Sequence, residues 1–143
     1  MSALPIVAAN PNPHFQRLGG EAAVARLVDA FYRAMDQRDD ARAIRAMHDA
    51  DLAQTKAVLR IYLAEWLGGP KRYSAERGQP RLRRVHMPFA IDTNARDAWL
   101  ACMRQALDEI GADAALRDEL LAAFAKVADH LKNTDTDSTH RSP

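Results

Sequence analysis

The residue in this sequence with the clearest capacity for chemistry is His86. It ends a short segment that precedes Pro88, with Leu82 before it and Phe89 after it. A neutral imidazole walled by these two apolar side chains can bind a metal ion. Guanidinium groups, which pair well with carboxylates, precede it at Arg81, Arg83 and Arg84. The plainer interpretation is a surface histidine at a helix C-terminus, where the helix dipole favours it, and composition alone favours this interpretation.

Aromatic and polar side chains on or beside apolar stripes form a second group of candidates. Tyr32 follows Val28 by four residues, so its ring is expected to point inward, and a buried hydroxyl then needs a partner. His48 is more typical of a surface corner than of a ligand, and Cys102 falls among core positions, where a thiol behaves as a small hydrophobe. Core packing is the simpler interpretation for each of four aromatic residues: Tyr32, Tyr62, Trp66 and Trp99.

The elements that must position these residues are helices. Apolar residues at helical spacing predict a first long helix over 21–36, after the Gly19-Gly20 pair. A charged corner with short helical turns follows over 37–50. A second helix is predicted over 52–66, with Asp51 as a plausible N-cap, and it must end at Gly68-Gly69-Pro70.

The second half of the chain continues this pattern. The polar stretch 71–80 is predicted to be a loop, and a short helix is predicted over 80–86. Asp92 or Thr93 is expected to cap a third long helix that Gly111 closes, and a fourth helix runs to about Lys132. No stretch shows the sustained alternation of a strand, so the fold class is all-α. We expect one folded domain over 14–132, a flexible N-terminal extension over 1–13 and a disordered tail over 133–143.

Composition excludes several other classes of protein. The 143 residues fit one domain, and a formal net charge of +1 gives little reason to expect nucleic acid or an anionic membrane as a partner. No stretch approaches the roughly 20 apolar residues of a membrane span. Cys102 is the single cysteine, which favours a reducing, cytoplasmic setting. The sequence contains no P-loop, GxGxxG, HExxH, CxxC or GxSxG motif.

Six short motifs in register carry a resemblance to a known family. They are Leu18-Gly19-Gly20, Phe31-Tyr32, the run over 66–70, the run over 78–83, the run over 86–89 and the run over 96–103. Over Phe15 to about Asn133, the chain resembles the truncated haemoglobins, specifically their second group. The resemblance implies a two-over-two helical sandwich around one haem b.

The resemblance also implies the roles of particular residues. His86 would be the proximal iron ligand, which reverses the preference for a surface histidine. The implied distal ligand pocket consists of Tyr32, His48, Thr55, Leu59 and Trp99. The implied haem contacts are Phe31, Tyr62, Leu63, Tyr73, Arg83, Arg84 and Phe89, with the basic residues or Tyr73 near the haem carboxylates.

The function that the resemblance implies is reversible binding of dioxygen and other diatomic ligands, such as CO and NO, at a five-coordinate iron, with polar distal donors slowing ligand release. One alternative is an enzyme for NO dioxygenation or peroxide-linked oxidation, which would need a reductase. Another is a haem-free helical sensor or interaction module. Direct binding of His48 or Tyr32 to the iron is open, and the protein is expected to be a monomer or a weak homodimer.

Overall fold

The computed structural model describes residues 13–79, 81–82, 86, 89 and 91–132, and within these ranges it contains helices and no strand. The elements are α2 (His14–Leu18), α3 (Gly20–Gln37), the 3₁₀ turn η1 (Asp39–Ala41), α4 (Arg42–Ala46), α5 (Ala53–Trp66), α6 (Arg72–Arg77), α8 (Thr93–Glu109) and α9 (Ala114–Leu131). The all-α prediction is confirmed. Residues 1–12 of the predicted N-terminal extension over 1–13 lie outside the described residues. The predicted tail over 133–143 and most of the helix predicted over 80–86 also lie outside them.

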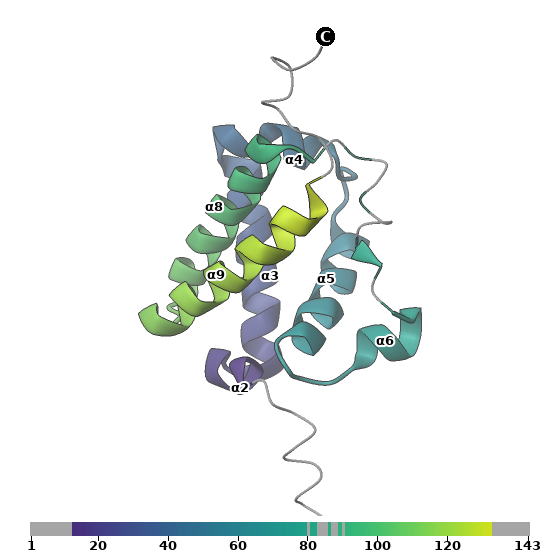
Figure 1. The fold of residues 1–143 in the computed structure, drawn as a ribbon, viewed down its shortest axis with the longest axis vertical. Coiled ribbons are helices and arrows are strands. Elements are labelled where there is room, and N and C mark those ends of the chain that lie inside the picture. Colours follow the sequence, from purple (N-terminus) through teal and green to yellow (C-terminus); the bar gives the residue numbers. More distant parts are fainter. Residues whose placement is uncertain (1–12, 80, 83–85, 87–88, 90, 133–143) are drawn as a thin grey trace, which may run out of the picture.

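The long helices form two packed pairs. Helix α3 packs against α5, α8 packs against α9, and α3 and α8 join the two pairs. Figure 1 shows α9 crossing in front of α3, with α8 on one side and α5 on the other. This is the two-over-two arrangement of helices that the sequence resemblance implies. None of the helices in the described ranges has the length and apolar character needed to cross a membrane.

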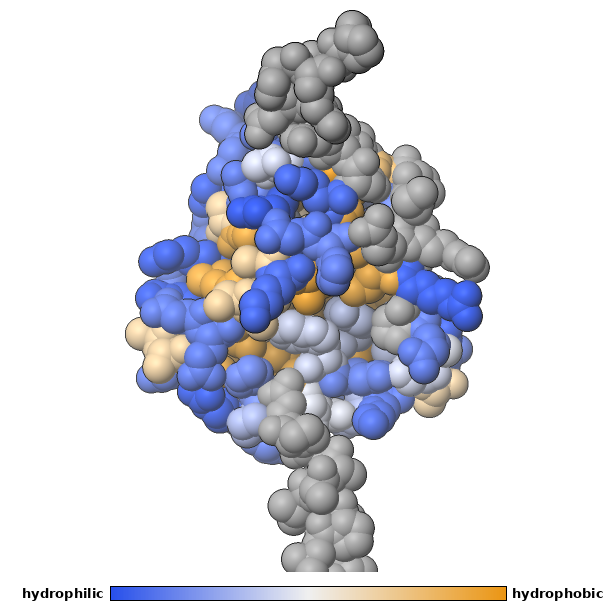
Figure 2. All heavy atoms as spheres, in the orientation of Figure 1, coloured by the Kyte–Doolittle hydropathy of each residue, from blue (hydrophilic) through white to orange (hydrophobic). Residues whose placement is uncertain are grey.

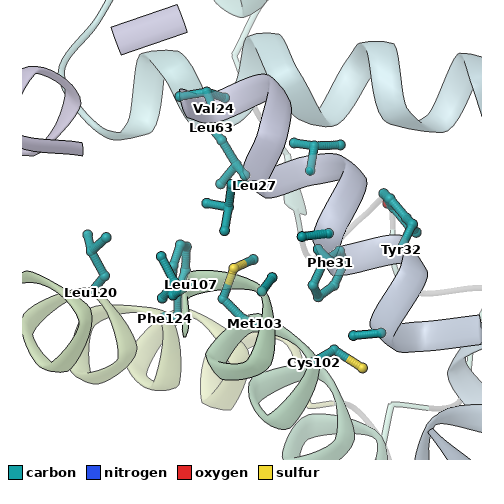
Figure 3. Packing of buried hydrophobic residues seen from close by; sticks show 14 of the residues in the cluster. Val24, Leu27, Phe31, Tyr32, Leu63, Cys102, Met103, Leu107, Leu120 and Phe124 are labelled. Atoms are coloured by element: carbon teal, nitrogen blue, oxygen red, sulfur yellow. The ribbon is translucent and has the colours of Figure 1, made fainter. Parts of the chain in front are cut away.

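The core forms where α3 meets the α8–α9 pair. Helix α3 buries nine of its residues, among them the predicted apolar stripe that includes Val24, Leu27 and Phe31. Figure 3 shows Leu27 and Phe31 on the side of α3 that faces Met103 and Leu107 of α8 and Leu120 and Phe124 of α9, with Val24 beside Leu63 of α5. Burial of one stripe at helical spacing is what fixes the face that α3 presents to its neighbours.

The turn after α5 is held against the N-terminal helix. Helix α5 ends at Trp66, as the Gly68-Gly69-Pro70 sequence predicts. The backbone N–H of Phe15 donates to the carbonyl of Leu67 at 2.8 Å. A Cβ atom at Gly69 would lie 2.6–2.8 Å from the Phe15 ring, which is closer than two carbon atoms can pack. Glycine is therefore required here for close approach of the backbone to an aromatic ring.

We expect Gly69→Ala to lower the free energy of unfolding by about 1–3 kcal/mol, the usual cost of overpacking a buried contact. Urea denaturation of the purified protein measures the change. The control is the same substitution combined with Phe15→Leu, since removal of the ring should relieve part of the clash. Strictly additive effects of the two substitutions would contradict this account.

The structure corrects the prediction of a loop over 71–80, because Arg72–Arg77 form helix α6. A carboxylate of the preceding helix organises this polar segment. Glu65 accepts a hydrogen bond from the Ser74 backbone N–H at 2.8 Å and another from the Ser74 hydroxyl. The Tyr73 ring also packs edge-on against Tyr62, with ring centroids 5.4 Å apart. Contacts between α5 and α6 therefore override a local composition typical of a loop.

These hydrogen bonds make the order of α6 sensitive to acid. The Ser74 hydroxyl, and after it the Ser74 backbone N–H, lower the pKa of the Glu65 carboxyl below its usual 4.5. The stabilisation is therefore present above pH 4.5 and is lost as the pH falls through the lower pKa of the folded state. We expect Glu65→Ala to speed hydrogen exchange at the Ser74 amide at neutral pH and to abolish its acid sensitivity. Glu76→Ala removes a carboxylate from α6 itself, the helix that carries Ser74, and is the matched control. An equal effect of Glu76→Ala on the Ser74 amide would contradict the prediction.

Candidate functional site

The imidazole of His86 is held in a defined tautomer. Its Nδ1 atom lies 2.7 Å from the carbonyl oxygen of Leu82, four residues earlier. A carbonyl oxygen only accepts hydrogen bonds, so Nδ1 carries the hydrogen and, in the neutral ring, Nε2 carries the lone pair. The ring is half-buried, on a residue with helical backbone. A hydrogen bond that fixes one nitrogen and leaves the lone pair on the other is the usual arrangement of a histidine that binds a metal.

His48 has the same local geometry on a different element. Its Nδ1 atom lies 2.8 Å from the carbonyl oxygen of Ile44, again four residues earlier, just after α4. In the neutral ring, Nε2 is therefore a hydrogen-bond acceptor and not a donor. The sequence resemblance implied that His48 could donate a hydrogen bond to a bound ligand. With this tautomer, Nε2 can donate such a bond only when the ring is protonated.

Tyr32 carries a buried hydroxyl for which the described residues provide no hydrogen-bond partner. The residue is 4% exposed, and burial raises its pKa to about 12. Within the ranges that the structure describes, its hydroxyl makes no hydrogen bond. Since an unpartnered buried hydroxyl is costly, Tyr32 is ready to donate to a polar atom that is not part of the described protein.

The structure connects three predicted pocket residues through ring contacts that involve Tyr32 and Phe31. The Tyr32 ring lies edge-on to that of His48, with centroids 5.7 Å apart, and edge-on to that of Phe31 at 5.0 Å. The Trp99 ring of α8 meets Phe31 at 5.2 Å. The Trp99 indole N–H likewise makes no hydrogen bond to a described residue. One O–H donor and one N–H donor, neither with an acceptor among the described residues, therefore belong to side chains that contact the Phe31 ring.

Helix α5 supplies an apolar wall that the protein covers only in part. It buries Leu63 and Ala64 fully, whereas α3 buries nine residues. The predicted pocket residues Thr55, Leu59 and Tyr62 lie at helical spacing and are half-buried. Figure 2 shows hydrophobic residues reaching the surface between α9 and α5. An apolar helix face left partly open, near the buried Tyr32 hydroxyl and the partly buried Trp99 indole, suits a flat apolar cofactor with polar chemistry at its centre.

The predicted haem contacts differ in how deeply the structure buries them. Leu63 and Phe31 are each 1% exposed and lie in the core. Tyr73 is half-buried on α6, and Phe89 is 37% exposed. Arg83 and Arg84, predicted to meet the haem carboxylates, lie outside the described residues. The sequence interpretation missed the carbonyl groups of Leu82 and Ile44, although the four-residue spacing before each histidine was the available signal.

Comparison with known proteins gives consistent results. The family model for bacterial-like globins matches residues 13–133. A group 2 truncated haemoglobin of Bacillus subtilis (YjbI) is 34% identical over 123 residues, which cover 86% of this chain and 90% of that protein. The group II 2-on-2 haemoglobin of Agrobacterium tumefaciens is 39% identical with a TM-score of 0.80, covering 84% of this chain and 93% of that one. The truncated oxygen-avid haemoglobin of Bacillus subtilis is 33% identical with a TM-score of 0.77, covering 85% and 99%.

Proposed function

Since this chain belongs to the bacterial-like globin family and is a truncated haemoglobin, we propose that it holds one haem b and reversibly binds dioxygen and other diatomic ligands. The observation that carries the proposal is the His86 imidazole, whose Nδ1 bond to the Leu82 carbonyl leaves the lone pair on Nε2. The haem, when bound, supplies an iron with one open position for a diatomic ligand. His86 would hold the iron, Tyr32 and Trp99 would donate toward a bound ligand, and α5 would supply apolar walls.

His86 acts as the proximal ligand in this proposal. The Leu82 carbonyl accepts the Nδ1 hydrogen, which orients the ring and makes Nε2 more electron-rich. Because Leu82 and His86 both have helical backbone and lie four residues apart, this bond also sets the direction in which the ring points.

Tyr32 and Trp99 act as donors toward the diatomic ligand. A dioxygen molecule that carries partial negative charge accepts hydrogen bonds better than an uncharged one. A hydrogen bond to a charged acceptor contributes about 1.5–3 kcal/mol. The neutral His48 ring accepts from Nε2, so its place in the proposal is beside the Tyr32 hydroxyl. The oxygen-avid relative from Bacillus subtilis supports slow release of dioxygen as the property that these donors provide.

The walls of the pocket belong to several elements. Thr55 and Leu59 line the ligand side from α5, while Arg83, Arg84 or Tyr73 would lie near the haem carboxylates. The proposed contacts with the porphyrin, or with the core beneath it, are Phe31, Tyr62, Leu63, Tyr73 and Phe89.

Haem reconstitution tests this function. The full chain is loaded with haem, and visible spectra are recorded in the ferric, ferrous and CO-saturated forms. We expect a strong Soret band that shifts when CO is added and when the ferrous protein is exposed to dioxygen. A protein that fails to take up haem, or whose loaded ferrous form does not respond to CO, would overturn the proposal.

A further inference from the structure

Six aromatic rings form a continuous series of contacts through the molecule. The series runs from Trp66 to Phe124, Trp99, Phe31, Tyr32 and His48, and the successive ring centroids are 4.6, 5.3, 5.2, 5.0 and 5.7 Å apart. The rings come from α5, α9, α8 and α3 and from the residues after α4. The series therefore connects the proposed ligand pocket with the far end of α5.

The closest contact of the series, between Trp66 and Phe124, lies in the part between the two tryptophans. The Phe124 ring stacks on Trp66 with 16° between their planes, and it meets Trp99 edge-on at 68°. Phe124 is 4% exposed, whereas Trp66 is partly exposed. One buried ring thus bridges two partly exposed indoles, that of Trp99 in the predicted ligand pocket and that of Trp66 at the end of α5.

The two ends of the series differ in how readily their side chains give up an electron. Indole is among the side chains most easily oxidised by one electron, and its radical cation is delocalised over two rings. Phenol gives up an electron readily only when its proton has an acceptor. The Tyr32 hydroxyl makes no hydrogen bond within the described residues, so its side of the series is the poorer path. Electrons are supplied more readily from Trp66 through Phe124 and Trp99.

We propose that Trp66, Phe124 and Trp99 form an electron relay by which the oxidising power of hydrogen peroxide leaves the haem pocket and reaches Trp66. This inference rests on the proposed function, because the peroxide reacts at the haem. One molecule of hydrogen peroxide takes up two electrons and two protons and yields two molecules of water.

Each electron reaches the pocket through Trp99, leaving Trp66 oxidised by one electron, with its indole proton released to solvent. A phenolic donor then restores the Trp66 indole by giving up one electron and one proton. Two turns of this relay convert one hydrogen peroxide and two phenols into two waters and two phenoxyl radicals. The donor reacts at Trp66 and does not need to enter the pocket.

Packing alone also explains why these rings touch, since aromatic pairs prefer edge-on and offset arrangements. The two roles separate when an indole is replaced by another ring. Trp66→Phe keeps an aromatic side chain next to Phe124 but removes the oxidisable group. Trp99→Phe keeps the contact with Phe31 and removes the indole at the pocket.

The experiment treats the haem-loaded full chain with one equivalent of hydrogen peroxide and locates oxidised residues by peptide mass spectrometry. We expect oxidation at Trp66, which falls strongly when a phenol such as guaiacol is present. In Trp99→Phe, we expect most of the Trp66 oxidation per peroxide consumed to be lost. In freeze-quenched Trp66→Phe, the tryptophanyl radical signal should move to Trp99. The haem-free protein, treated identically, is the control for direct attack by peroxide.

The relay is overturned if Trp66 is oxidised equally in the haem-free protein, or if its oxidation per peroxide consumed is the same in Trp99→Phe. It is also overturned if the loaded protein consumes peroxide while Trp66 remains intact. Failure of the proposed function looks different, because the chain would then show no Soret band before any peroxide is added.

Discussion

Replacing His86 by alanine should produce a folded protein that binds haem more weakly. Added imidazole should restore the coordination of the iron. The His86 ring is half-buried and lies outside the main core, so its removal leaves the packing of α3 against α8 intact. Loss of a group that only hydrogen bonds with a metal ligand typically costs about 10–100-fold in affinity. Loss of the ligand itself should therefore weaken haem binding by at least that range.

Haem transfer to an excess of apomyoglobin measures the affinity, and visible spectra report the coordination of the iron. Free imidazole should enter the space left by the side chain and return the ferrous and CO spectra towards those of the original protein. His48→Ala is the matched control, because His48 makes the same bond to a carbonyl four residues earlier yet lies beside Tyr32. Haem retention and CO spectra that are unchanged in His86→Ala would show that another residue binds the iron.

The helices and their buried faces could be predicted because each long helix carries its own periodic pattern. The stripe on α3, the cap of α8 and the stop after α5 are all local signals, and the structure confirms each of them. The Asp92 side chain accepts from the Ala95 N–H at 2.8 Å, which also decides between the two caps considered for α8. Helix α6 could not be predicted, because what orders it is a carboxylate on another helix, Glu65.

Some features of the candidate site could likewise be predicted from the sequence, and others could not. The types of residue in the pocket follow from the sequence and its resemblance to truncated haemoglobins. Whether a histidine donates or accepts does not follow from its type, because the Leu82 and Ile44 carbonyls set the tautomers of His86 and His48. Whether the Tyr32 hydroxyl has a partner depends on α3, α4 and α8 together, and no local pattern contains that information.

Tyr32→Phe should have opposite effects on stability and on ligand binding. In the haem-free protein, the Tyr32 hydroxyl is buried and makes no hydrogen bond within the described residues. Removal of one buried, unpartnered polar group should raise the free energy of unfolding by about 1–3 kcal/mol. Thermal and urea denaturation of the haem-free variant measure this gain.

The stability difference should also widen at high pH. Burial raises the pKa of Tyr32 from 10.0 to about 12, so the folded protein holds the hydroxyl proton over a range in which the unfolded chain releases it. The original protein therefore loses stability as the pH rises from 10 through 12, whereas the phenylalanine variant has no such group to titrate. A gain that stayed constant over this range would contradict the burial of the hydroxyl.

In the haem-loaded protein, the same substitution should speed the release of dioxygen. A hydrogen bond to a charged acceptor contributes about 1.5–3 kcal/mol, which corresponds to dissociation faster by roughly 10- to 100-fold. Stopped-flow displacement of dioxygen by CO gives the rate. Tyr62→Phe removes the same hydroxyl from the half-buried wall of α5 and should change the rate much less. If Tyr32→Phe released dioxygen no faster than Tyr62→Phe, the Tyr32 hydroxyl would not be the donor. A Tyr32→Phe variant that is more stable without haem and also releases dioxygen faster would show two things. Burial of this hydroxyl by α3 lowers the stability of the haem-free protein, and the same hydroxyl stabilises bound dioxygen.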